Sequence, residues 1–145
     1  MLDLELLQPG QLRQVYEWDN VSALEDFEPY AARLSCGNWL HYAINRDGQF
    51  VGCLSLELIG ADEAGFHLSM QPRSVRLADL RHALISTGAV LFQGGIRKII
   101  AEICPENRSA RLLAALCGMI PAGQIGAYRR FELTAAEFAA KAIRL

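Results

Sequence analysis

Residues 96–119 constrain the fold more tightly than any other stretch of the chain. They begin with an isoleucine-rich run that ends at Pro105, a residue with no N–H to give to a β-ladder. Asn107 follows where its side-chain oxygen can accept from the first turn of a helix, and Gly118 suits the left-handed residue that ends one. The segment therefore predicts a buried strand, a capped turn and a short amphipathic helix.

Apolar periodicity and turn residues predict the other elements. The Asp47-Gly48 pair supplies positive φ angles between two β-rich runs, so it predicts a hairpin. Pro29 is expected to interrupt a weak helical region. The predicted strands are residues 2–6, 39–45, 49–58, 65–70, 96–103 and 127–133, and the predicted helices are residues 11–19, 20–34, 75–93 and the stretch between Asn107 and Gly118.

The C-terminal residues 134–145 are predicted to form an additional helix. Thr134 and Glu137 have the spacing of a capping box, in which each side chain accepts from the backbone N–H of the other residue. The apolar residues Phe138, Ala142 and Ile143 recur at helical spacing. That apolar face must cover either this domain or a neighbouring protein, and the sequence leaves both readings open.

Composition places the chain among single-domain proteins without a disulfide framework. The 145 residues are expected to form one domain, 1–145, and a net charge of −2 gives no general attraction to nucleic acid. No apolar run approaches the roughly 20 residues of a membrane span, and no signal peptide is expected. The four cysteines lack metal-binding spacing, so we expect no metal site and read them as reduced core residues of a cytoplasmic protein.

The order of strand, Asn-capped helix and Gly-Met resembles the closing half of the GNAT (acyl-CoA N-acyltransferase) fold. Asn107, Ala110, Leu113 and Gly118 carry the resemblance, at offsets of zero, three, six and eleven residues. It implies an α/β (α+β) fold with a mixed, largely antiparallel twisted sheet of six or seven strands and helices on both faces. In such a fold acetyl-CoA enters a wedge beside the strand that here ends near Pro72.

Two departures from the family pattern bear on activity. The glycines that cradle the CoA pyrophosphate match Arg76, Ala78 and Leu80, whose side chains are expected to crowd the phosphates, and Asp79 is expected to repel them. The tyrosine that returns a proton to the departing thiolate in many members matches Ala114.

These departures favour a non-catalytic protein with a degenerate site and no cofactor. The chain is then similar to bacteriophage GNAT-like proteins, including an internal virion protein of short-tailed phages. That reading implies binding to a protein partner or assembly into a homo-oligomer, in the cytoplasm or in a virion.

The alternative is an acetyl-CoA-dependent N-acetyltransferase acting on a small amine or a protein amino group. His67 is then the general base, because it lies on the strand that borders the cleft in the family and because an unperturbed imidazole has a pKa near neutral. Glu57 and Glu102 are weaker candidates for the base, and Tyr128 is the candidate proton donor. His41 and His82 receive no role.

The same alternative names candidate cofactor-binding residues. The backbone of Met70 is expected to bind the pantetheine, and Arg73 and Arg76 are expected to bind the phosphates. Asn107 is a further candidate, although we expect it to act first as a helix cap.

Overall fold

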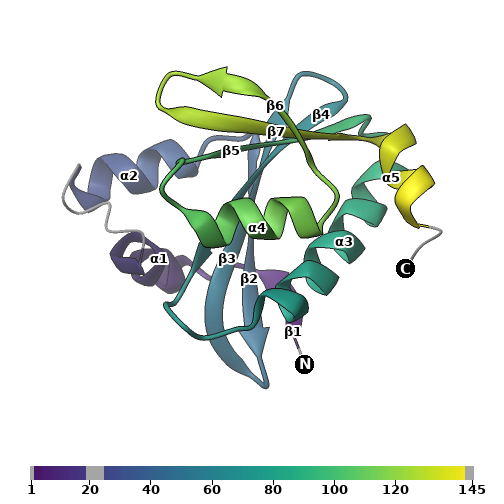
Figure 1. Cartoon of the computed structure of the whole chain (residues 1–145). Coiled ribbons are helices and arrows are strands. Elements are labelled where there is room, and N and C mark those ends of the chain that lie inside the picture. Colours follow the sequence, from purple (N-terminus) through teal and green to yellow (C-terminus); the bar gives the residue numbers. More distant parts are fainter. Residues whose placement is uncertain (1, 19–24, 143–145) are drawn as a thin grey trace. The chain divides into compact units, whose positions relative to one another are not determined.

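The computed structural model describes residues 2–18 and 25–142 of the chain. This part contains seven strands and five α-helices (Figure 1). The strand order is β1-β2-β3-β4-β5-β7-β6. The pairs β1–β2, β2–β3, β5–β7 and β6–β7 are antiparallel, whereas β4 and β5 are parallel. The predicted fold class, a mixed and largely antiparallel sheet with helices, is confirmed.

The chain divides into two compact units. The N-terminal unit comprises residues 1–57 and 67–76, and the C-terminal unit comprises residues 58–66 and 77–145. The expectation of one domain over 1–145 stays a prediction, and each unit is described by itself. Within the described residues no helix is both long enough and apolar enough to cross a membrane.

Three strands and two α-helices lie wholly or mainly in the N-terminal unit, and β4 is shared between the units. Their bounds are β1 Leu2–Leu6, α1 Leu12–Trp18, α2 Phe27–Leu34, β2 Trp39–Arg46, β3 Gln49–Ile59 and β4 Glu63–Met70, with a short 3-10 helix at Pro9–Gln11. The predicted interruption at Pro29 is wrong. Pro29 lies in the first turn of α2, where its missing N–H has no intrahelical partner in any case. Of the predicted helical region 20–34, residues 20–24 lie outside the described part.

The β2–β3 hairpin fixes which side chains face each other across the N-terminal unit. Asp47 and Gly48 have φ angles of 51° and 84°, which are typical of a two-residue type I′ turn. A register shift after Ile44 then leaves Val51 as an extra residue in β3. Because of this bulge, the strand positions beyond it pair one residue later than a regular hairpin would pair them.

The C-terminal unit is built from α3 onward. Its elements are α3 Leu77–Gln93, β5 Lys98–Ile103, α4 Arg108–Leu116, β6 Ile120–Ile125, β7 Tyr128–Thr134 and α5 Ala135–Ala142. Sequence periodicity missed β6, an edge strand whose six residues are all exposed, because such a strand has no buried face and no alternation.

The ends of α4 and α5 follow the predicted capping patterns. Gly118, at φ 86°, is the left-handed residue after α4, and Met119 N–H donates to the Ala114 carbonyl oxygen at 3.0 Å. At the start of α5, Thr134 N–H donates to Glu137 Oε1 at 2.9 Å and Glu137 N–H donates to Thr134 Oγ1 at 3.2 Å. Both caps are confirmed.

The prediction that the cysteines are core residues is wrong for two of them. Cys53 is buried, but Cys36 and Cys104 are exposed. Cys104 follows the last residue of β5, where the chain turns outward and its thiol donates to Glu106 Oε2 at 2.7 Å. That hydrogen bond raises the pKa of Cys104, and burial raises the pKa of Cys117 to about 11. Neither thiol is therefore a ready thiolate nucleophile near neutral pH.

Candidate active site

His67, the predicted general base, lies on β4 in the N-terminal unit. Its side chain is exposed. Its ring centroid is 4.9 Å from that of Trp39, at an interplanar angle of 45°. An exposed imidazole against an indole ring can take a proton from a solvent-borne amine, which is the chemistry expected of a general base.

His41 carries the most constrained side chain near His67. Its Nε2 lies 2.6 Å from the Leu34 carbonyl oxygen and its Nδ1 lies 2.7 Å from Ser55 Oγ. A carbonyl oxygen only accepts, so Nε2 carries the proton, and in the neutral ring Nδ1 accepts from the Ser55 hydroxyl. The His41 ring also stacks on Trp39, with centroids 5.8 Å apart and planes 10° apart.

These four side chains, Trp39, His41, Ser55 and His67, form what we name the imidazole cluster. The β2–β3 register places Trp39 opposite Glu57 and His41 opposite Ser55, so both pairs are on one face of the hairpin. Glu57, the weaker candidate for the base, therefore borders the cluster and is half-buried.

An aromatic wall continues from the cluster into α1 and α2. Tyr16, Tyr30 and Leu34 form a buried group against which Phe27 and Trp39 pack. Tyr16 and Tyr30 have ring centroids 5.1 Å apart. Trp39 thus joins the buried aromatic group to the exposed His67 ring.

The loop after β4 bends without glycine. Ser74 N–H donates to the Gln71 carbonyl oxygen at 3.3 Å and closes a turn in which Pro72 precedes Arg73. Arg73 has a φ of 59°, a conformation that favours glycine, and its side chain is exposed. Arg46 Nη1 donates to the Ser74 carbonyl oxygen at 2.5 Å and holds the turn against the hairpin.

Met70, the candidate for pantetheine binding, turns its side chain toward β3. Its Sδ lies 2.2 Å from the position that a Cβ on Gly52 would occupy. The thioether therefore fills the space that glycine leaves on the neighbouring strand. Only the backbone of Met70 remains as a candidate for contacts with a cofactor.

The crowding expected at the matched glycine positions is wrong for Leu80. This side chain is only 4% exposed and belongs to the core, so it does not extend from the start of α3 toward solvent. Arg76 and Ala78 are exposed, as is Asp79 in the first turn of α3. The residue type gives the volume of a side chain, but it does not give the direction in which the side chain points.

Asn107 acts as the cap of α4 in the C-terminal unit. Its Oδ1 accepts from Ala110 N–H at 3.1 Å, which confirms the structural role. Ala114 is buried at 6% exposure and offers no proton donor. Arg81 of α3 donates from Nε to the Leu116 carbonyl oxygen at 2.9 Å and thereby caps the end of α4.

Tyr128, the candidate proton donor, is the first residue of β7 and is 49% exposed. Glu102 lies on β5 opposite Arg130 of β7. The structure thus brings His67, Met70, Arg73 and Arg76 into the N-terminal unit, and Asn107 and Tyr128 into the C-terminal unit.

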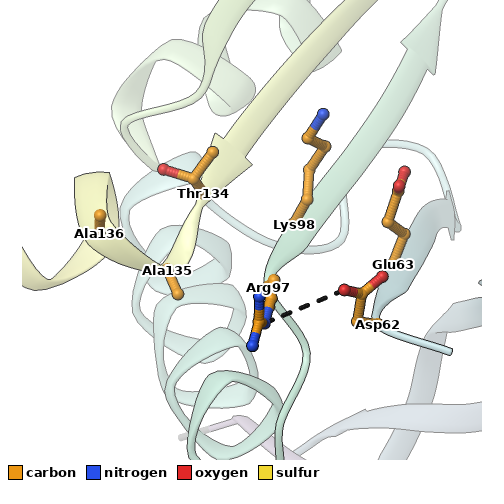
Figure 2. A pocket seen from close by; sticks show the side chains of 7 residues that line it. All are labelled: Asp62, Glu63, Arg97, Lys98, Thr134, Ala135 and Ala136. Atoms are coloured by element: carbon orange, nitrogen blue, oxygen red, sulfur yellow. Dashed lines mark ion pairs between the residues drawn. The ribbon is translucent and has the colours of Figure 1, made fainter.

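The C-terminal unit also holds an open pocket of about 490 Å³ (Figure 2). Arg97 Nε faces Asp62 Oδ2 across it at 4.0 Å, and Lys98 Nζ pairs with Glu132 Oε1 at 3.3 Å. No predicted site residue lines this pocket, whose lining is Asp62, Glu63, Arg97, Lys98, Thr134, Ala135 and Ala136.

Sequence reasoning missed His41, Ser55 and Trp39 as members of the site. The sequence predicts the Asp47-Gly48 turn, and pairing residues outward from this turn predicts which residues of the two strands face each other. A regular hairpin, however, would place His41 opposite Leu54, whereas the bulge at Val51 places it opposite Ser55. No local sequence signal marks that bulge.

Comparisons with solved structures agree with this fold along nearly the whole chain. One is spermidine N-acetyltransferase from Vibrio cholerae in complex with CoA and spermine, with a TM-score of 0.75, 18% identity, and coverage of 95% of this chain and 98% of that one. Aminoglycoside acetyltransferase AAC(6')-Ib in complex with coenzyme A is similar with a TM-score of 0.78 and 17% identity, and the match covers 98% of this chain and 99% of that one. PaiA N-acetyltransferase from Thermoplasma acidophilum in complex with coenzyme A has a TM-score of 0.70 and 13% identity, and the match covers 92% of this chain and 99% of that one. No protein-family model matches the sequence, and no curated protein matches it.

These comparisons confirm the GNAT fold and correct the functional expectation. The expectation of a non-catalytic, virion-like assembly protein is overturned, because the similar structures are acetyltransferases, several of them in complex with CoA. The similarity to phage proteins has no support in them. That expectation rested on the absence of loop glycines, but Arg73 adopts a glycine-like conformation and Leu80 is directed into the core.

Proposed function

We propose that the protein is an acetyl-CoA-dependent N-acetyltransferase whose acceptor is a small amine or a protein amino group. The observation that carries the proposal is the shared fold, which extends over 92% to 98% of the chain in acetyltransferases solved with coenzyme A. The exposed imidazole of His67 on β4 supports it, because acyl transfer to an ammonium ion first requires a base.

In the proposed reaction His67 removes a proton from the ammonium group of the acceptor. The free amine then attacks the thioester carbonyl carbon, and a C–N bond forms as the nitrogen loses a second proton to solvent. The C–S bond breaks, and the thiolate takes up a proton and leaves as the free thiol of CoA. Ala114 cannot supply that proton, so the hydroxyl of Tyr128 is the proposed donor. Tyr128→Phe should then lower kcat without changing the affinity for acetyl-CoA.

The N-terminal unit offers cationic groups for the cofactor. Arg73 and Arg76 are exposed guanidinium groups in and just after the turn that follows β4, and the backbone of Met70 is the proposed contact for the pantetheine. The left-handed Arg73 gives this loop the bend that glycine would otherwise supply. The carboxylate of Asp79, in the first turn of α3, is the group in this stretch that would repel a phosphate.

Thermal unfolding in the presence of acetyl-CoA tests cofactor binding. A ligand at 100 times its Kd stabilises the folded state by about 2.7 kcal/mol, so the melting temperature should rise by several degrees. Arg73→Ala combined with Arg76→Ala should reduce the rise. Arg97→Ala, an exposed arginine in the C-terminal unit, is the matched control and should preserve it.

Mass spectrometry of acceptors incubated with the protein and acetyl-CoA tests catalysis. Suitable acceptors are polyamines, aminoglycosides and lysine peptides. A mass increase of one acetyl group that depends on His67 would support the proposal. The absence of both a melting-temperature shift with acetyl-CoA and acetyl transfer to any of these amines would overturn the proposal.

A further inference from the structure

His41 of β2 is tied to two other elements of the N-terminal unit at once, α2 and β3. Its Nε2–H donates to the carbonyl oxygen of Leu34, the last residue of α2, whose helical position leaves that oxygen without an intrahelical donor. Its Nδ1 pairs with Ser55 of β3, which is 9% exposed. Hydrogen bonds on both sides therefore fix the orientation and the tautomer of the His41 ring. The ring is a rigid surface on which the Trp39 indole stacks.

Trp39 has ring contacts to both His41 and His67. The near-parallel stacking with His41, at 10°, restricts rotation of the indole about its side-chain bonds. The indole in turn lies 4.9 Å from the ring of His67, which is an exposed residue. An exposed ring samples several rotamers unless a neighbour limits them.

We propose that His41 is a positioning residue that fixes Trp39 and, through Trp39, the imidazole of His67. This inference rests on the proposed function for its catalytic consequence, since His67 is the base in that reaction. It assigns a role to Ser55 as well, because the Ser55 hydroxyl keeps Nδ1 of His41 occupied and so holds the ring in register. Proton transfer is sensitive to such positioning, because a displacement of about 1 Å can cost about 100-fold in rate.

A double-variant cycle tests the catalytic part. His67→Gln should lower kcat by about 10²- to 10⁴-fold, the range of general base catalysis. His41→Gln should lower kcat by about 10-fold with the KM for acetyl-CoA unchanged, an effect below the roughly 100-fold cost of a full 1 Å displacement. If His41 acts only through His67, the double variant should be no slower than His67→Gln alone. Independent losses that multiply would overturn the proposal.

Imidazole NMR tests the positioning part without any acceptor. The chain has three histidines, so their ring signals can be assigned by substitution. His41→Gln and Trp39→Phe should move the His67 ring-proton signals, because the ring current of the indole acts on them. His82→Gln, on the exposed face of α3, is the matched control and should leave them in place. Unmoved His67 signals in His41→Gln would overturn the proposal.

One further variant and one outcome of the kinetic cycle separate the positioning role from the proposed function. Ser55→Ala removes one hydrogen bond but keeps the imidazole ring, so it should shift the His67 signals less than His41→Gln does, even if the latter folds poorly. Full activity in His67→Gln would refute the assignment of the base in the proposed function, while moved His67 signals would still support the positioning role. The two failures are therefore distinguishable.

Discussion

Asn107 shows at the residue scale how a polar side chain stabilises the start of a helix. Its Oδ1 satisfies Ala110 N–H, one of the N–H groups that the start of a helix leaves without a partner. Asn107→Ala should therefore lower the free energy of unfolding by about 0.5–2 kcal/mol. Urea denaturation measures the loss, and Asn107→Ser, which keeps a capping oxygen, should restore most of it. Unchanged stability together with lost acetyl-CoA binding would contradict the cap.

Glu132 gives a residue-scale prediction about pH. The hydrogen bond from Arg130 Nε, at 2.7 Å, and the nearby Lys98 lower the pKa of Glu132 below its ordinary 4.5. A carboxyl whose folded pKa is depressed contributes its stability fully above the unfolded pKa and loses it as the pH falls through the folded value. Stability should therefore fall as the pH is lowered below about 4.5, the ordinary value. In Glu132→Gln that fall should be shallower in melting curves recorded from pH 7 to pH 3, and an identical profile would exclude this contribution.

At the scale of elements, the contact between β3 and the end of β4 depends on Gly52. A Cβ at this position would meet Met70 Sδ at 2.2 Å and the Ser69 carbonyl oxygen at 3.1 Å. The Met70 side chain can move aside but the backbone oxygen cannot, so Gly52→Ala should destabilise the protein by about 1–3 kcal/mol.

Chemical denaturation measures this cost against Gly37→Ala, where a Cβ would meet nothing within 4 Å and where we expect little change. Combining Gly52→Ala with Met70→Ala should recover part of the loss, because the thioether is then gone. A double variant whose loss is the full sum of the two single losses would refute the assigned contact.

At the scale of the whole molecule, α5 completes the C-terminal unit. Phe138 lies 5.0 Å from Phe92 of α3 between ring centroids, and the Lys141 ammonium donates to the Gly118 carbonyl oxygen at 2.5 Å. Figure 1 shows α5 beside the far end of α3. This packing accounts for the apolar Phe138 within its own unit, while the expected protein partner or homo-oligomer stays a prediction, and Ile143 lies outside the described residues.

Deleting residues 134–145 should consequently lower stability, since the packing of Phe138 and the contact with Gly118 are lost together. Phe138→Ala should lower it too, by less than the 3–5 kcal/mol that a fully buried phenylalanine costs, because Phe138 is half-buried. Val90→Ala, at a side chain 69% exposed on α3, is the control and should change little. Gel filtration of the truncated protein separates the two readings, because a stable chain that loses only self-association would assign α5 to a contact between copies.

The sequence by itself determined the features that depend on neighbours along the chain. The helix caps at Asn107 and Thr134, the left-handed Gly118 and the Asp47-Gly48 turn are each set within a few residues, so local chemistry sufficed to predict them. Apart from β6, the order of strands and helices followed from the same signals, and with it the resemblance to the GNAT fold.

Only the tertiary structure decided which residues meet at the candidate site. The bulge at Val51 shifts the hairpin by one residue and brings Ser55, instead of Leu54, opposite His41. Leu80 points into the core, and Arg73 adopts a left-handed backbone conformation. The sequence of this stretch nevertheless suggests a loop that has lost its glycines. Register and side-chain direction depend on packing between residues far apart in the chain, and a pattern of residue types contains neither.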